Sequence, residues 1–349
     1  MFLEAWLLMV QSVFRGSSHA SRYAVVVWVR YGLVGVAVTA LAMSDFQLKI
    51  HQYLMCLVAI DVLALLASAA PGFAKKSMAP SEEVAANPRA LYWTSVQYGM
   101  PIVLTSVLAM VVANGDRYVV HALLSHDQLA GYVTMAKLAG AMAFASAPVN
   151  LWWPSARFKH AKDPDQGAAF YSSACMVLLA YYVIVAMLAS LLAPLVIRWY
   201  GQGIAGYDPL SMALLLAAAV TTAMVTPMNV GTLNVGKTHW SIFAVAASAV
   251  LGLVCAYYLI PRHGYVGAAG SALLAQLTYL VLIHLISQRI QPLLFSYRKP
   301  LMLVFVFVVS MVGLLQLPAT SALTWLGFTF FSGLALFMSG PEIKKVLIA

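Results

Sequence analysis

Charged residues are scarce in this chain. Asp, Glu, Lys and Arg make up 9% of its 349 residues, against roughly 25% in an ordinary soluble domain. Hydrophobic residues make up 62%, and the mean hydropathy is +0.87. So few charges cannot cover a surface that faces water, which excludes a soluble globular protein. Most of the chain is therefore expected to lie in lipid.

Cysteines are also few, and the motifs of phosphate and metal chemistry are missing. Cys56, Cys175 and Cys255 fall in three different apolar segments and form no C-x-x-C pair, so we interpret them as small apolar residues. The sequence has no G-x-x-x-x-G-K-[ST] phosphate loop and no grouping of nucleophile, base and metal ligands. It therefore predicts no cofactor, no metal site and no enzyme activity, and any transport would be secondary.

Long apolar stretches dominate what is present. A helix needs about 20 apolar residues to cross a bilayer, and ten stretches meet that requirement, while residues 1 to 14 are apolar but short and suit a truncated span or an interfacial helix. The predicted fold is an all-α integral membrane protein with about ten to eleven transmembrane helices. The ten stretches are residues 22 to 43, 46 to 71, 92 to 114, 128 to 150, 168 to 197, 208 to 230, 238 to 260, 265 to 286, 299 to 317 and 321 to 339.

Basic residues alternate between the loops. Fourteen Lys and Arg lie in one set of alternate loops and the C-terminal tail, four lie in the other set, and Arg30 and Lys137 lie inside spans. Because Lys and Arg are retained in the cytoplasm during insertion, the C-terminus is predicted to be cytoplasmic. The net charge of +9 then reflects topology and does not indicate nucleic acid as a partner.

One polar break divides the chain. Residues 74 to 90, AKKSMAPSEEVAANPRA, hold two prolines and two glutamates between basic ends, as expected for a cytoplasmic linker between lobes. Residues 1 to 73 then hold two full spans and the short first segment, and residues 91 to 349 hold eight.

Two motifs of the larger part resemble a known family. NGDRYVVHALLSHDQLAGYVTMAKLAGAMAFASAPVNLWWPSARF, residues 114 to 158, places Asp116 and Arg117 before a G-Y-x-x-x-A-K-L helix, and residues 233 to 285 carry G-K-x and P-x-x-G-x-x-G-A-A turns. Both are similar to O-antigen-type polysaccharide flippases of the multidrug/oligosaccharidyl-lipid/polysaccharide exporter superfamily. The resemblance implies two pseudo-symmetric lobes, with residues 91 to 349 as the second lobe and two additional C-terminal helices.

The resemblance extends to the start of the chain. QSVFRGSSHASRYAVVVWVRYGLVG resembles the passage from the fourth to the fifth helix of the first lobe. Residues 1 to 73 would then be a remnant holding the fourth to sixth helices, with the first three absent.

Three charges at membrane depth are the candidate substrate contacts, because such charges usually face a partner or a wet cavity. Arg30 and Asp61 are expected at similar depth, and two interpretations stay open. They form a structural ion pair, or the Arg30 guanidinium makes two hydrogen bonds to a substrate phosphate and Asp61 modulates that contact. Lys137 lies nine residues into its span. It either snorkels to the headgroups or, as we favour, lines a cavity for an anionic lipid head.

Other candidate residues are identified by their place at the ends of the predicted spans or inside them. Asp116 and Arg117 are expected at the outer mouth, as a local ion pair or a substrate contact. Gly99 with Pro101, Pro194 and Pro227 predict bends, either stable kinks or hinges for rocking of a lobe.

These features predict a secondary flippase of the inner membrane for a polyprenyl-diphosphate-linked oligosaccharide in surface polysaccharide biosynthesis. Its partners would be that lipid-linked oligosaccharide, membrane lipids, a coupling ion (proton or sodium) and polysaccharide-assembly proteins. The alternatives are a cation-coupled drug exporter of the same superfamily, a polysaccharide polymerase and an inactive truncated relative. The diphosphate lipid itself is implied by the resemblance.

Overall fold

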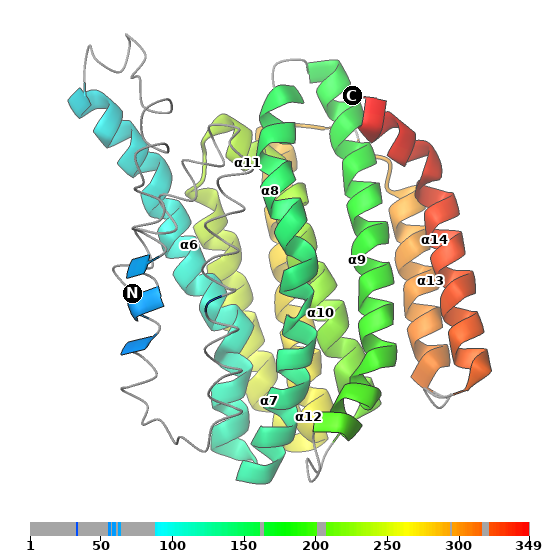
Figure 1. Ribbon diagram of the computed structural model, residues 1–349. Coiled ribbons are helices and arrows are strands. Elements are labelled where there is room, and N and C mark those ends of the chain that lie inside the picture. Colours follow the sequence, from blue (N-terminus) through cyan, green and yellow to red (C-terminus); the bar gives the residue numbers. More distant parts are fainter. Residues whose placement is uncertain are drawn as a thin grey trace. The chain divides into compact units, whose positions relative to one another are not determined.

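The computed structural model describes residues 88–160, 164–200, 207–293, 295–315 and 321–348, together with a few single positions before residue 88 (Figure 1). The chain divides into two compact units, Met1–Tyr92 and Trp93–Ala349. The description below concerns the second unit, because nearly all described residues belong to it. Arg30, Asp61 and most of the predicted linker lie outside the described residues.

The described residues of the second unit form helices and no strand. In lipid a backbone must satisfy its own hydrogen bonds, which favours continuous helices. The helices are α6 (Pro88–Leu123), α7 (His126–Gly140), α8 (Met142–His160), α9 (Pro164–Tyr200), α10 (Pro209–Met228), α11 (Val230–Val235), α12 (Trp240–Ile290), α13 (Arg298–Leu315) and α14 (Ala322–Ile348).

Local sequence explains where two of these helices begin. Ser125 caps α7 with a capping box, in which its hydroxyl accepts from the Gln128 amide and the Gln128 side chain accepts from the Ser125 amide. Asp208 caps α10, where Oδ2 accepts from the Ser211 amide at 2.7 Å, and Pro209 follows at the first helical position. Both caps satisfy amides that would otherwise lack partners in the first turn.

The long helix α12 is two antiparallel arms. Gly264 has φ 54° and ψ −125°, outside the helical region, and the chain reverses there. A Cβ on Gly267 would lie 2.3 Å from the Leu259 carbonyl oxygen, and one on Gly252 would lie 2.7 Å from the Ala275 Cβ. The two arms therefore pack with almost no space between them, and only glycine fits at these two positions.

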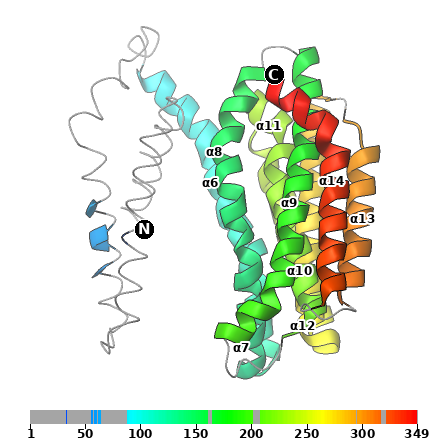
Figure 2. The same ribbon diagram turned by 45° about the vertical axis from the view of Figure 1, so that its right-hand side comes forward.

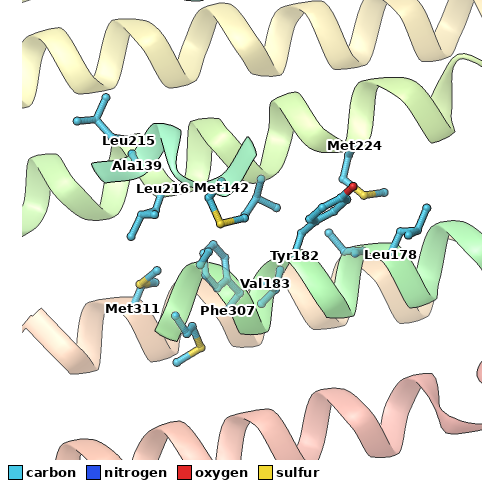
Figure 3. Close-up of a cluster of buried hydrophobic side chains, with 14 of the residues drawn as sticks. Ala139, Met142, Leu178, Tyr182, Val183, Leu215, Leu216, Met224, Phe307 and Met311 are labelled. Atoms are coloured by element: carbon cyan, nitrogen blue, oxygen red, sulfur yellow. The ribbon is translucent and has the colours of Figure 1, made fainter. Parts of the chain in front are cut away.

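Helices α9 and α10 are the most enclosed part of the unit. In the most apolar 18-residue stretch of each of these segments 56% of the residues are buried, compared with 17% in the corresponding stretch of α6. Within lipid this packing is driven by van der Waals contact and close approach, which the many alanines of α10 permit. Figure 3 shows part of this core, formed by Ala139, Met142, Leu178, Tyr182, Val183, Leu215, Leu216, Met224, Phe307 and Met311.

An ion cluster ties the last two helices to α9. The Lys299 Nζ lies 2.8 Å from Glu342 Oε1, and the Lys345 Nζ lies 2.9 Å from Glu342 Oε2. The Ser173 hydroxyl donates to the same carboxylate at 2.8 Å. Glu342 thus connects α9, α13 and α14 at one end of the bundle.

The composition of the helices confirms the predicted class in its coarse form, a helical membrane protein. Among the described residues, six helical segments are long and apolar enough to cross a membrane, and one of them is the two-armed α12. Many of their large apolar side chains are exposed, as lipid-facing residues are, including Met110, Phe144, Tyr257, Phe330 and Phe337.

Candidate functional site

A cavity of about 490 Å³ lies within the second unit. Its walls come from α6, α7, α8, α10 and the second arm of α12. Figure 2 shows α6, α7 and α8 on the side of α9 that faces away from α13 and α14. Small residues make most of the wall, including Ala136, Ala139, Gly140, Ala218 and Ala272. Because small side chains line the facing helices at this level, the helices can be in contact above and below it and still leave a cavity between them.

Eight residues of the cavity wall have polar or charged side chains. They are Asn114, Asp116, Arg117, Ser146, Asn150, Thr222, Thr226 and Gln276. Several are satisfied by their own helix, since the Asn114 amide donates to the Met110 carbonyl and the Thr222 hydroxyl to the Ala218 carbonyl. Polar groups within a membrane are costly and usually face a partner or water, so the cavity is suited to a hydrated or polar ligand.

Asp116 is the buried acidic group of the cavity. Its side chain is buried, and it lies seven residues before the end of α6, about 10 Å along the helix axis. The fully buried Tyr132 of α7 donates its hydroxyl proton to Asp116 Oδ2. Oδ1 is buried and has no hydrogen-bond partner among the described residues. One carboxylate oxygen is therefore left without a hydrogen bond from the described residues.

Arg117 supplies the neighbouring positive charge. It also lines the cavity, and its Nε is buried without a hydrogen-bond partner among the described residues. The salt bridges found between described residues are the two at Glu342. A guanidinium beside a carboxylate gives the cavity wall both a positive and a negative group. Such a wall can bind a zwitterionic ligand, or a cation and an anion in turn.

Lys137 does not line this cavity. Its side chain is exposed in the last turn of α7, whereas Ala136, Ala139 and Gly140 around it reach the cavity wall. Phe144, seven residues further along the chain, is also exposed. The proposed contact of Lys137 with an anionic lipid head stays a prediction.

The predicted hinge positions lie inside helices or at their ends. Gly99 and Pro101 fall within the continuous α6, and Pro194 within the continuous α9. Pro227 lies one residue before the last residue of α10, where Asn229 separates α10 from α11. A proline removes one backbone hydrogen bond at each site.

Tyr132, the partner of Asp116, and Gln276 of the cavity wall were not anticipated. Tyr132 belongs to the G-Y-x-x-x-A-K-L segment, but its contact with Asp116 joins residues 16 apart on different helices. Gln276 lies 7% exposed in the second arm of α12. A lone Gln within an apolar span was the signal that could have identified it, because amides are rare at membrane depth.

No family model, curated protein or solved structure matches the chain. In the part of the chain that the structure describes, no group of three His, Cys, Asp or Glu residues is placed to hold a metal ion. The cavity is thus defined by its own geometry: it lies among long apolar helices, its wall is mainly apolar, and the wall holds one carboxylate and one guanidinium.

Proposed function

We propose that the chain is a secondary transporter of the cytoplasmic membrane that flips a polyprenyl-diphosphate-linked oligosaccharide toward the outer leaflet. The observation that carries the proposal is the hydrogen bond from Tyr132 to Asp116, a carboxylate of the cavity wall. These residues belong to the D-R and G-Y segments that resemble polysaccharide flippases. The proposal includes ten to eleven spans in two lobes, with a cytoplasmic C-terminus.

The helix pair of α12 also supports the proposal. Residues 233 to 285, which resemble the paired helices of that family, include the P-x-x-G-x-x-G-A-A turn at residues 261 to 269. In that turn Gly264 reverses the chain and Gly267 allows the arms to touch. The glycine spacing therefore has a packing role that a chance match would not require.

In this mechanism the buried cavity serves the coupling ion. Asp116 would take a proton or a sodium ion on Oδ1, which has no hydrogen-bond partner among the described residues, with Tyr132 holding the carboxylate through Oδ2. The diphosphate is assigned to Arg30 and Lys137, because a guanidinium or an ammonium compensates phosphate charge at membrane depth. Secondary transporters place such sites near the bilayer midplane and alternate between two states.

The experiment introduces Arg30→Ala and Lys137→Ala at the chromosomal locus and measures export of surface polysaccharide, with immunoblotting of the protein in membranes. Both variants should lose export and keep near-normal protein levels. Lys137→Arg should keep part of the activity, whereas Arg30→Lys should lose more, because a lysine cannot reproduce a bidentate fork. Arg262→Ala, an exposed cation at the turn of α12, is the matched control and should export normally. Normal export by both alanine variants would overturn the proposal.

A cation-coupled drug exporter is the second candidate. The burial of Asp116 in a mainly apolar cavity favours it, because such exporters bind cationic drugs through buried carboxylates. Accumulation of ethidium in cells distinguishes the two functions. Under the flippase proposal, loss of the gene changes polysaccharide export and leaves ethidium accumulation unchanged.

A further inference from the structure

The segment that joins α7 and α8 has weaker internal bonding than an ordinary stretch of helix. The two helices meet at Ala141, where the Phe144 amide donates to the Ala141 carbonyl, three residues back instead of four, at 3.0 Å. Pro148 follows and has no N–H to offer the turn before it. A tightened turn or a proline inside a helix marks a place where the helix bends.

Buried side chains anchor both ends of this segment. On α7, Tyr132 is fully buried. On α8, the buried Trp153 stacks on Phe170 of α9, with ring centroids 6.4 Å apart and planes 15° apart. Between these anchors, residues 141 to 150 are exposed or half-buried except for Met142. The middle of the segment is therefore less constrained by packing than its ends.

A side chain of α9 holds the middle of the segment. The Tyr181 hydroxyl donates to the Ala145 carbonyl oxygen of α8 at 3.0 Å, and Tyr181 itself is 36% exposed. Ala145 lies in the turn before Pro148 and does not belong to the cavity wall. The hydrogen bond therefore fastens the segment to α9 from outside the cavity.

The break between α10 and α11 is held much more tightly. It follows Pro227, and Asn229 and Thr232 are buried there. The Gly231 amide donates to the Ser287 hydroxyl oxygen of α12 at 2.8 Å. A Cβ on Gly231 would lie 2.3 Å from the Ser287 carbonyl oxygen. Because α11 lies this close to α12, the break at Pro227 is suited to a stable kink, in contrast to the segment between α7 and α8.

We propose that residues 140 to 148 are a hinge, and that Tyr181 is a strap that holds the hinge in the open form seen in this structure. Release of the strap lets the segment approach α10 and close the polar cavity. Helices with small residues on their facing sides can come into contact within lipid. The cavity wall has such residues on both sides, namely Ala139, Gly140 and Ala143 on α7 and α8, and Ala218, Ala219 and Ala223 on α10.

The closed form would be one of the two states between which a secondary transporter alternates. The purpose of the motion thus rests on the proposed function. The motion itself does not, because it depends only on the contacts of α7, α8, α9 and α10 and is measured without a substrate.

The experiment measures the distance across the cavity by double electron–electron resonance, on the purified full chain in lipid nanodiscs. Spin labels replace two exposed residues, Ala147 of α8 and Leu277 of the second arm of α12. Cys56 and Cys255 are changed to serine, and the buried Cys175 stays in place. The parent should show a major population at a longer distance and a minor population at a shorter one.

Two variants should move these populations in opposite directions. Tyr181→Phe removes the strap and should raise the shorter-distance population at least about twofold relative to the longer one, as expected for the loss of one hydrogen bond. Gly140→Leu should abolish the shorter-distance population. A Cβ at this position of the cavity wall meets nothing within 4 Å, so the open form accepts leucine, and the side chain then fills the space that closure needs. The double variant should behave as Gly140→Leu.

Two controls distinguish the hinge from general loosening of the fold. Gly313→Leu adds the same side chain to α13, at a glycine that also meets open space and lies outside the cavity wall. Ser287→Ala removes the bond that holds the break between α10 and α11. Both should keep the parental distance distribution. The thermal midpoint of each variant is measured in parallel, so that unfolding is not mistaken for motion.

Three outcomes would overturn the proposal. A distance distribution that Tyr181→Phe leaves unchanged would exclude the strap. A shorter-distance population that persists in Gly140→Leu would exclude closure against α10. A shift by Ser287→Ala equal to that of Tyr181→Phe would place the hinge between α10 and α11. Failure of the flippase proposal would appear in polysaccharide export and would leave these distances unchanged.

Discussion

At the scale of residues, the hydrogen bond from Tyr132 holds Asp116, a carboxylate of the cavity wall. The sequence identified Asp116 as a polar residue next to Arg117, and hydropathy ended the span at residue 114. The structure continues α6 to Leu123 and places both charges in the wall of a cavity. A charge ends an apolar run in a hydropathy profile, but it does not end a helix when a cavity receives it.

This contact predicts different effects for two near-isosteric variants. Tyr132→Phe removes the buried partner of Asp116 and should cost about 1 to 3 kcal/mol, because a buried acceptor is left unsatisfied. Asp116→Asn keeps an acceptor for the Tyr132 hydroxyl and should keep the thermal midpoint close to that of the parent. Under the proposed coupling role it should nevertheless abolish export.

Thermal unfolding in detergent and polysaccharide export measure the two effects. Asp208→Asn offers a matched control, because Asp208 caps α10 and does not line the cavity. Export by Asp116→Asn at the parental level would contradict the coupling role of this carboxylate.

At the scale of elements, the arms of α12 show how glycines set helix contact. The sequence predicted two spans, residues 238 to 260 and 265 to 286, with a break between them, and the structure places the reversal at Gly264. The pattern could not show which glycines touch the opposite arm. Gly267 meets the backbone of Leu259, whereas a Cβ on Gly270 would have nothing within 4 Å.

The two glycines therefore give a matched pair of substitutions. Gly267→Ala should destabilise the fold by about 1 to 3 kcal/mol or more, because overpacking forces the arms apart. Gly270→Ala, one helical turn away, should be neutral or slightly stabilising, since alanine favours the helix and meets open space. The yield of monodisperse protein and its thermal midpoint in detergent measure both. Equal tolerance of both substitutions would show that the arms do not pack as the structure has them.

At the scale of the whole molecule, the basic residues gather at alternate helix ends. Within the second unit, the junction of α8 and α9, the start of α12 and the start of α13 carry Lys159, Lys237 and Lys299. The turn that follows α9 and the turn between the two arms of α12 lie at the opposite helix ends. This arrangement agrees with the alternation of loops on which the predicted topology depends.

Reporter fusions test that topology. Fusions at Lys159, Lys237 and Lys299 should report the cytoplasm, and fusions at Tyr200 and His263 the outside, because basic loops are retained during insertion. A fusion after Leu124, just beyond the end of α6 at Leu123, should also report the outside. Two or more inverted reports would contradict the predicted orientation.

The sequence by itself determined the membrane class and most span positions of the second unit. Predicted spans at residues 168 to 197 and 208 to 230 correspond to apolar segments Gly167–Arg198 and Pro209–Val235, because crossing a bilayer is a local property of about 20 consecutive residues. Only the tertiary structure decided that Tyr132 holds Asp116, that Lys137 lies outside the cavity wall, and that Tyr181 of α9 donates to Ala145 of α8. These outcomes depend on which helix faces pack together. Contacts between residues far apart in the chain decide which face of each helix is buried.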